Sequence, residues 1–193
     1  SPVKENWLYR SPYFFFLALK FLFELSPELK NRIEFHQIGK FPSWLEQMVA
    51  EFNLTDNLVN VGFIPKSELQ AKLQSSDFFL GTAVKVEEGL DYAIASKTFD
   101  YLSVYKPVLS FTVAGAQSSF TEDSNCGLVF NPDKPEENAR KLKQIFQNGI
   151  SLRLNKSYLE KFHRKNTAKM LSGVFDGIIE SSKAPLSKKH IGA

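Results

Sequence analysis

Short apolar runs alternate with segments whose apolar residues recur at helical spacing over most of the chain. The apolar runs predict strands, and the helical spacing predicts helices between them. The predicted strands cover residues 33–39, 58–65, 77–82, 108–111 and 126–130, and the predicted helices cover 11–25, 43–52, 67–74, a short segment from 96, 118–122, 133–149 and 152–179, with a break near Gly173. Residues 83–95 show no clear period and are predicted to form a loop. Asp133, three residues before Glu136, is predicted to cap the helix at 133–149. This alternation favours an α/β fold of three layers, with a mostly parallel sheet and helices on both faces.

The segment 96–111 combines a helix start, a corner and a buried strand. Ser96 is predicted to cap the helix with its hydroxyl oxygen, and Pro107 separates the helix from the apolar strand 108–111. Asp100 falls in the first helical turn, where the helix dipole favours a carboxylate. The residue types alone leave two interpretations of Asp100: it stabilises the helix start, or it contacts a ligand at the carboxyl edge of the sheet.

Composition bounds the class of protein. With 193 residues, 43% of them hydrophobic and 18 of them Phe, the chain is predicted to form one domain over 1–180 with an aromatic core. Three lysines and no acid lie in 181–193, which is predicted to be a disordered basic tail. Without this tail the basic and acidic residues balance, so nucleic acid is not the expected partner. Three lysines would allow weak peripheral contact with anionic lipid.

Cysteine usage and hydropathy indicate a cytoplasmic protein, or one peripheral to the membrane. Cys126 is the single cysteine, so no internal disulfide and no metal cluster is expected. No signal peptide is recognised at the start of the sequence. The apolar run 13–25 contains Lys20 and Glu24 and is shorter than a spanning helix, which predicts a buried amphipathic helix instead.

The run Ser-Lys-x-Phe-Asp-Tyr-Leu-x-x-x-Lys-Pro-Val-Leu at 96–109 resembles the donor-site helix of retaining, two-domain (GT-B fold) glycosyltransferases, in particular family-4-like members. The resemblance implies that Asp100, seven positions before Pro107, binds the ribose hydroxyls of a sugar nucleotide. Two features depart from the family's pattern. The acid is Asp where Glu is common, and Tyr105 replaces a usual Gly. The family's second Glu falls on Tyr92, beside Asp91.

The resemblance extends over nearly the whole chain. Matching segments are 9–12 with the helix after it, 35–39, 61–69, 76–77 and 125–133. In such proteins a strand and a glycine turn precede the first helix, and an acceptor-binding half precedes the donor half; neither is recognised here. The resemblance therefore implies a Rossmann-like donor-binding domain, inactive by itself. The whole enzyme would transfer a sugar from a nucleotide-diphosphate sugar to an acceptor hydroxyl, with retention, in glycan or polysaccharide biosynthesis.

Five residues are the candidate donor-binding contacts. Besides Asp100, the helix start at Ser96 offers amides for a diphosphate, Lys97 and Arg10 offer positive charge, and Gly39 ends its strand where a backbone approaches a ligand closely. No cofactor or metal ion is expected. Catalytic residues are not predicted, since the resemblance places them in the cleft between two halves.

Two other functions remain open from the sequence. A non-enzymatic α/β module would bind a partner protein through an aromatic surface and would have no nucleotide affinity. A sugar-nucleotide epimerase of the same architecture would need acids and histidines gathered near the nucleotide, and His36, His163 and His190 are isolated in the sequence. No dinucleotide or phosphate-loop glycine motif appears, which disfavours a dehydrogenase or an ATPase.

Overall fold

The computed structural model describes residues 4–183, with side chains described for residues 4–180. The chain divides into two compact units between Leu154 and Asn155. The helices of the first unit are α1 (Tyr13–Leu25), α2 (Ser43–Glu51), α3 (Lys66–Gln74), α4 (Lys97–Leu102), α5 (Ala116–Asp123) and α6 (Pro135–Asn148), with short 3-10 helices η1 (Trp7–Arg10), η2 (Pro27–Arg32) and η3 (Thr55–Asn57). Its strands are β1 (Glu5–Asn6), β2 (Phe35–Ile38), β3 (Leu58–Gly62), β4 (Phe79–Thr82), β5 (Lys85–Val86), β6 (Val108–Phe111) and β7 (Gly127–Phe130).

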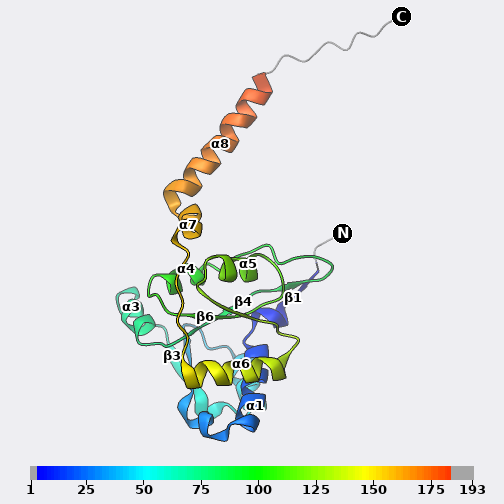
Figure 1. Ribbon diagram of the computed structural model, residues 1–193, viewed down its shortest axis with the longest axis vertical. Coiled ribbons are helices and arrows are strands. Elements are labelled where there is room, and N and C mark those ends of the chain that lie inside the picture. Colours follow the sequence, from blue (N-terminus) through cyan, green and yellow to red (C-terminus); the bar gives the residue numbers. More distant parts are fainter. Residues whose placement is uncertain (1–3, 184–193) are drawn as a thin grey trace, which may run out of the picture. The chain divides into compact units, whose positions relative to one another are not determined.

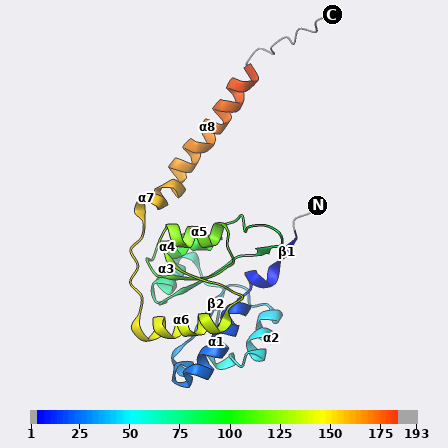
Figure 2. The ribbon, with the colours of Figure 1, turned by 45° about the vertical axis from the view of Figure 1, so that its right-hand side comes forward.

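Helices cover both faces of the parallel strands in this first unit, which confirms the predicted fold class. Helices α1 and α6 lie on one side of β4 and β6, and α4 and α5 lie on the other (Figure 1, Figure 2). The main core forms on the α1 side, where Phe111 and Phe130 from neighbouring strands stack with ring centroids 4.7 Å apart. Phe15 of α1 meets Phe111 edge-on at 5.5 Å. The aromatic core predicted from composition is thus built where α1 packs on the strands.

The sheet is not continuous, contrary to the expectation of one mostly parallel sheet. Strands β2 and β3 form one parallel pair, and β4, β6 and β7 form a parallel three-stranded sheet in the order β4-β6-β7. Strands β1 and β5 pair antiparallel, so the predicted loop 83–95 contains a short strand. Strands β2 and β4 make no ladder hydrogen bonds to each other, and residues of both strands line one cavity.

Local capping follows the sequence in one place and departs from it in another. The Ser11 hydroxyl accepts a hydrogen bond from the Tyr13 amide at 3.2 Å, close to the predicted helix start, and α1 itself begins at Tyr13 after Pro12. The predicted acidic cap at Asp133 is wrong: α6 begins at Pro135 after Lys134, without a side-chain cap. The Asp133 carboxylate instead accepts hydrogen bonds from Tyr9 and Lys85, which are distant from it in the sequence.

Tyr105 explains one departure from the family's pattern. Its φ is 56°, in the left-handed region that glycine adopts at no steric cost. The backbone after α4 therefore has the conformation for which Gly would be the ordinary choice, and this chain reaches it with a tyrosine.

The second unit contains α7 (Lys156–Leu159), η4 (Glu160–Phe162) and α8 (Arg164–Lys183). The helical region breaks at η4, so the predicted break near Gly173 is wrong, and α8 continues into the first residues of the predicted tail. The rest of that tail, 184–193, lies outside the described residues. Within 4–183, no helix has both the length and the apolar character needed to cross a membrane. The apolar run of α1 instead buries Phe16, Leu19 and Leu22, as predicted.

Candidate functional site

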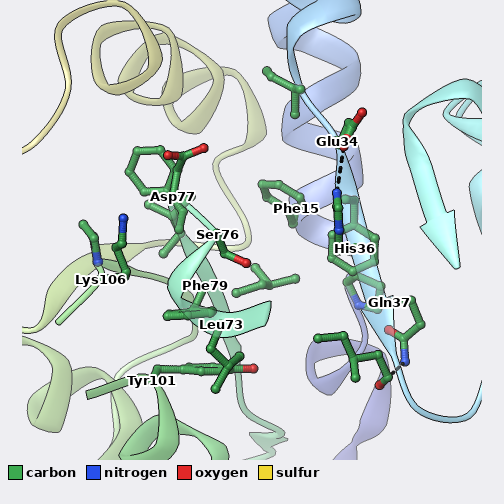
Figure 3. A pocket seen from close by; sticks show the side chains of 18 of the residues that line it. Phe15, Glu34, His36, Gln37, Leu73, Ser76, Asp77, Phe79, Tyr101 and Lys106 are labelled. Atoms are coloured by element: carbon green, nitrogen blue, oxygen red, sulfur yellow. Dashed lines mark hydrogen bonds and ion pairs between the residues drawn. The ribbon is translucent and has the colours of Figure 1, made fainter. Parts of the chain in front are cut away.

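A cavity of about 1080 Å³ lies in the first unit, between β2 and β4. Figure 3 shows the two strands on opposite walls, with His36 and Gln37 on one side and Phe79 on the other. Glu34 and Asp77, which precede the two strands, lie at the same end of the cavity, so β2 and β4 run in the same direction. Side chains from the helices α1, α3, α4 and α6 also line the cavity. The cavity therefore has an amino end and a carboxyl end, like the sheets beside it.

Arg10 and Lys97 line the carboxyl end of the cavity, and Lys40, which follows β2, lines the cavity as well. Arg10 is held there because its carbonyl accepts a 2.8 Å hydrogen bond from the hydroxyl of Thr82, the last residue of β4. Its guanidinium lies 5.2 Å from the ring centroid of Trp7. Lys97, the first residue of α4, lines the same cavity. Within residues 4–180, neither Arg10 nor Lys97 forms a salt bridge with a carboxylate.

The pKa of Lys97 is lowered, first by desolvation and then by the positive charge of Arg10. Desolvation and repulsion by Arg10 both disfavour the charged form of Lys97, although the residue keeps contact with solvent. An anion at this end of the cavity would relieve that repulsion.

An aromatic pair forms the wall next to these cations. The rings of Tyr101 and Phe79 stack with centroids 4.1 Å apart and an interplanar angle of 6°. Tyr101 follows Lys97 by one helical turn in α4, and both line the cavity. Burial, with a smaller contribution from the Asp100 charge, raises the pKa of Tyr101 to about 12. A flat apolar wall beside two cations suits a ligand with an aromatic ring and an anionic group.

The Tyr101 pKa predicts a loss of stability at alkaline pH. Because the folded chain holds the phenol proton more tightly than the unfolded chain, the free energy of unfolding is unaffected below pH 10. It then falls by on the order of 2 kcal/mol as the pH rises from 10 to about 12. Urea titrations at several pH values should show this fall in the wild type, and Tyr101→Phe should abolish it. The exposed Tyr105→Phe is the control; an equal effect there would contradict the assignment to Tyr101.

Tyr9 in η1, Lys85 in β5 and Asp133 after β7 form a polar cluster that the sequence does not predict. The Tyr9 hydroxyl donates to the Asp133 carboxylate at 2.5 Å, and the Lys85 ammonium donates to Tyr9 at 3.1 Å and to Asp133 at 3.3 Å. Burial, followed by the hydrogen bond to Asp133, raises the pKa of Tyr9. The cluster joins the residue before Arg10 to the segments after β4 and β7. No local pattern could have revealed it, because Tyr9 and Asp133 are 124 residues apart.

Asp91, beside the position of the family's second Glu, has a structural role in the fold. It is 4% exposed, and its carboxylate accepts hydrogen bonds from the amides of Ala93 at 3.1 Å and Gln117 at 3.2 Å. Its carbonyl accepts from the Ala116 amide at 2.7 Å. Asp91 therefore satisfies amides at the start of α5. Tyr92 is exposed, and its hydroxyl donates to the carboxylate of Glu5.

The other predicted contacts have varied placements. Asp100 is exposed in the first turn of α4 and is not among the residues that line the cavity. Ser96 precedes α4 with a helical backbone and no side-chain cap bond, so the predicted capping hydroxyl is wrong. Gly39 follows β2 with a φ of +97°, and its amide donates to the Gly62 carbonyl at 2.7 Å. An added Cβ at Gly39 would meet nothing within 4 Å, so the conformation, not close packing, calls for glycine.

The fold and the site define a class of protein: a Rossmann-like domain whose candidate ligand site lies at the carboxyl ends of parallel strands. Residues 16–148 match the family described as Glycosyl transferases group 1. Because this match covers most of the chain, the protein belongs to that glycosyltransferase family. The family assignment favours the transferase interpretation over the interaction module and the epimerase.

A solved structure supports the fold. The chain is similar to TarM from S. aureus, in a crystal structure of a mutant in complex with fondaparinux, α-GlcNAc-glycerol and UDP, with a TM-score of 0.51 and 18% sequence identity. The similarity covers 70% of this chain and 26% of that one, so the chain spans about a quarter of the length of TarM. No curated protein matches the sequence.

Proposed function

We propose that this chain is the donor-binding half of a glycosyltransferase and binds a nucleotide-diphosphate sugar at the carboxyl end of the cavity. The observation that carries the proposal is the pair Arg10 and Lys97, which line one cavity without a carboxylate partner among the described residues. Membership of a glycosyltransferase family supports it. So does the structural similarity to TarM, which was crystallised with UDP.

The chemistry of sugar transfer explains why two cations would be useful there. When a sugar leaves a nucleotide diphosphate, negative charge develops on the departing diphosphate. Cations already in position stabilise that charge without reorganising at the moment of reaction. The transfer, with retention of configuration and in glycan or polysaccharide synthesis, would also need an acceptor-binding half. We therefore expect this chain alone to bind the donor but not to transfer the sugar.

Asp100 is the proposed contact to the ribose. It lies three residues after Lys97, which places the two side chains on the same side of α4. A carboxylate accepts hydrogen bonds from both hydroxyls of a vicinal diol, so a ribose with its diphosphate on Lys97 would lie within reach of the same helix face. Because Asp is one methylene shorter than Glu, the ribose must lie closer to α4 for Asp100 to reach it.

The test is a titration of the isotope-labelled chain with UDP, GDP and ADP, followed by amide chemical shifts. We expect shifts at residues 96–101 and around Arg10, with one base preferred. Asp100→Ala should weaken binding by roughly tenfold, because charge-assisted hydrogen bonds to the ribose are lost. Asp56→Ala, an exposed carboxylate in η3, is the matched control and should leave the affinity unchanged. Equal affinities in wild type and Asp100→Ala would show that Asp100 does not contact the nucleotide. If no nucleotide changes any amide chemical shift, the proposed function is contradicted.

A further inference from the structure

The segment that carries Arg10 lies outside the parallel sheets. Strand β1 contains two residues and pairs with β5 in a two-stranded sheet, and η1 follows β1 directly. Such a short ribbon is marginally stable by itself. Arg10 is exposed, so its own side chain does not fix the backbone by burial. Contacts from other residues therefore decide how firmly Arg10 is held at the carboxyl end of the cavity.

Two anchors hold this segment, one on each side of the Arg10 α-carbon. On the carboxyl side, the Arg10 carbonyl accepts the 2.8 Å hydrogen bond from the Thr82 hydroxyl. On the amino side lies Tyr9, which is 8% exposed. The centroid of its ring is 4.4 Å from that of Phe14 and 4.8 Å from the Lys85 ammonium. Because Tyr9 immediately precedes Arg10, a displacement of Tyr9 moves the arginine backbone directly.

The Tyr9 hydroxyl is the centre of a closed set of hydrogen bonds. It accepts from the Lys85 ammonium at 3.1 Å and donates to the Asp133 carboxylate at 2.5 Å, while Lys85 also donates to Asp133 at 3.3 Å. The side chains of Lys85 and Asp133 are 37% and 49% exposed, so their salt bridge alone contributes little. The tyrosine hydroxyl, which is donor and acceptor at once, gives the set its fixed geometry.

The cluster lies next to the cavity wall without being part of it. Arg10 and Thr82 line the cavity, whereas Tyr9, Lys85 and Asp133 do not. Any effect of the cluster on a ligand in the cavity therefore passes through Arg10. Lys85 also offsets the negative charge of Asp133, which would otherwise oppose an anionic ligand on Arg10.

We propose that Tyr9, Lys85 and Asp133 are positioning residues, which hold Arg10 in place for the diphosphate of a nucleotide ligand. The inference rests on the proposed function, because it concerns how the same site is kept ready for its ligand. With the backbone fixed on both sides of Arg10, less conformational freedom is lost when the ligand binds. The cluster thus contributes to affinity without touching the nucleotide.

The first variant is Tyr9→Phe, which removes the hydroxyl and keeps the ring and the net charge. Its affinity for UDP, GDP and ADP is taken from amide chemical-shift titrations. We expect a roughly fivefold loss of affinity for the nucleotide that the wild type prefers, as for one hydrogen bond of ordinary strength. Tyr13→Phe makes the same chemical change in α1, at a residue that does not line the cavity. This matched control should leave the affinity unchanged.

Double-mutant cycles distinguish positioning of Arg10 from a general loss of packing. Tyr9→Phe should have no further effect on affinity when it is combined with Arg10→Ala, because the group that it positions is gone. Combined with Lys97→Met it should keep its full effect, because Lys97 is carried by α4. An equal loss of affinity with and without Arg10 overturns the proposal.

Asp133→Ala tests the same role with an effect opposite to that of charge. Removal of a carboxylate near a bound anion would by itself strengthen anion binding. We expect Asp133→Ala to weaken nucleotide binding instead, by a few-fold, because Tyr9 loses its acceptor. Asp56→Ala, which removes an exposed carboxylate in η3, controls for net charge. Binding that is stronger in Asp133→Ala than in wild type overturns the proposal.

Hydrogen exchange gives a measurement that needs no nucleotide. The Ser11 amide donates to the Leu8 carbonyl at 3.0 Å within the segment, and the Phe16 amide donates to the Pro12 carbonyl at 2.9 Å in α1. We expect Tyr9→Phe to speed exchange at Ser11 by roughly fivefold, because the segment opens more often, and to leave Phe16 unchanged. Unchanged exchange at Ser11 overturns the proposal.

The failure of this proposal differs from the failure of the donor site. If the wild type binds a nucleotide and Tyr9→Phe binds it equally well, the positioning role is overturned and the donor site stands. If the wild type binds no nucleotide, the donor site is contradicted and the positioning role falls with it. Faster exchange at Ser11 would then show that the cluster only anchors the fold.

Discussion

Replacing Gly127 with alanine is expected to destabilise the first unit by about 3 kcal/mol or more. Gly127 opens β7 and lies opposite Val108 of β6. A Cβ added to Gly127 would lie 1.9 Å from the Val108 carbonyl oxygen, well inside van der Waals contact. The obstacle is backbone in the middle of a three-stranded sheet, so no side-chain rotation can relieve it. The ladder between β6 and β7 must shift, and the stacked Phe111 and Phe130 must shift with it.

The measurement is urea unfolding of wild type and Gly127→Ala, followed by a signal from the first unit. Gly173→Ala is the matched control, because a Cβ there meets nothing within 4 Å and alanine is favoured inside the helix α8. We expect a lower urea midpoint for Gly127→Ala than for wild type, and an unchanged midpoint for Gly173→Ala. A free energy of unfolding for Gly127→Ala within about 0.5 kcal/mol of the wild-type value would mean that β6 and β7 are not paired in this register.

Removing the charges of Arg10 and Lys97 at the mouth of the cavity is expected to lower nucleotide-diphosphate affinity by roughly a hundredfold, since each charged hydrogen bond is worth about 1.5–3 kcal/mol. The double variant is Arg10→Ala with Lys97→Ala. The two effects should not add, because the charges share one ligand and influence each other's environment. The residual affinity should also lose most of its dependence on salt, since the screened interaction is gone.

Stability provides an independent readout of the same pair. Each cation raises the electrostatic free energy of the other, as the lowered Lys97 pKa shows. Lys97→Met keeps the length of the side chain and removes the charge, so it should weaken nucleotide binding without lowering the melting temperature. Lys20→Ala, an exposed lysine on α1 that does not line the cavity, controls for net charge. Calorimetric titration and thermal unfolding of these variants check both effects; if Lys20→Ala weakens binding as much as Lys97→Met, the cations act only through net charge.

The Tyr9, Lys85 and Asp133 cluster links these two predictions. It ties the segment that carries Arg10 to the loop after β7. A displaced β7 would therefore disturb the position of Arg10 as well as the core. We infer that the candidate donor site depends on the packing of the three-stranded sheet, although none of the β7 residues lines the cavity.

Local patterns in the sequence predict most elements of this protein and its fold class. Apolar periodicity is a local property, so the strands at 35–38, 79–82, 108–111 and 127–130 and the helices between them could be predicted from short windows. Lys97 in the motif at 96–109 and Arg10 in the first loop were both predicted, and the structure brings them to one cavity. For Asp100 the motif remains the argument, since its carboxylate does not line that cavity.

The partners of the polar groups and the division of the strands into sheets depend on long-range contacts, which short sequence windows do not contain. Asp133 was predicted as a helix cap because local spacing allowed it, but Tyr9 and Lys85 reach it from distant parts of the chain. Likewise, an apolar pattern predicts that a strand forms, but it does not predict which strands will pair with it. The open edges of β2 and β4 therefore appear only when the chain is folded, because pairing depends on contacts between residues far apart in sequence.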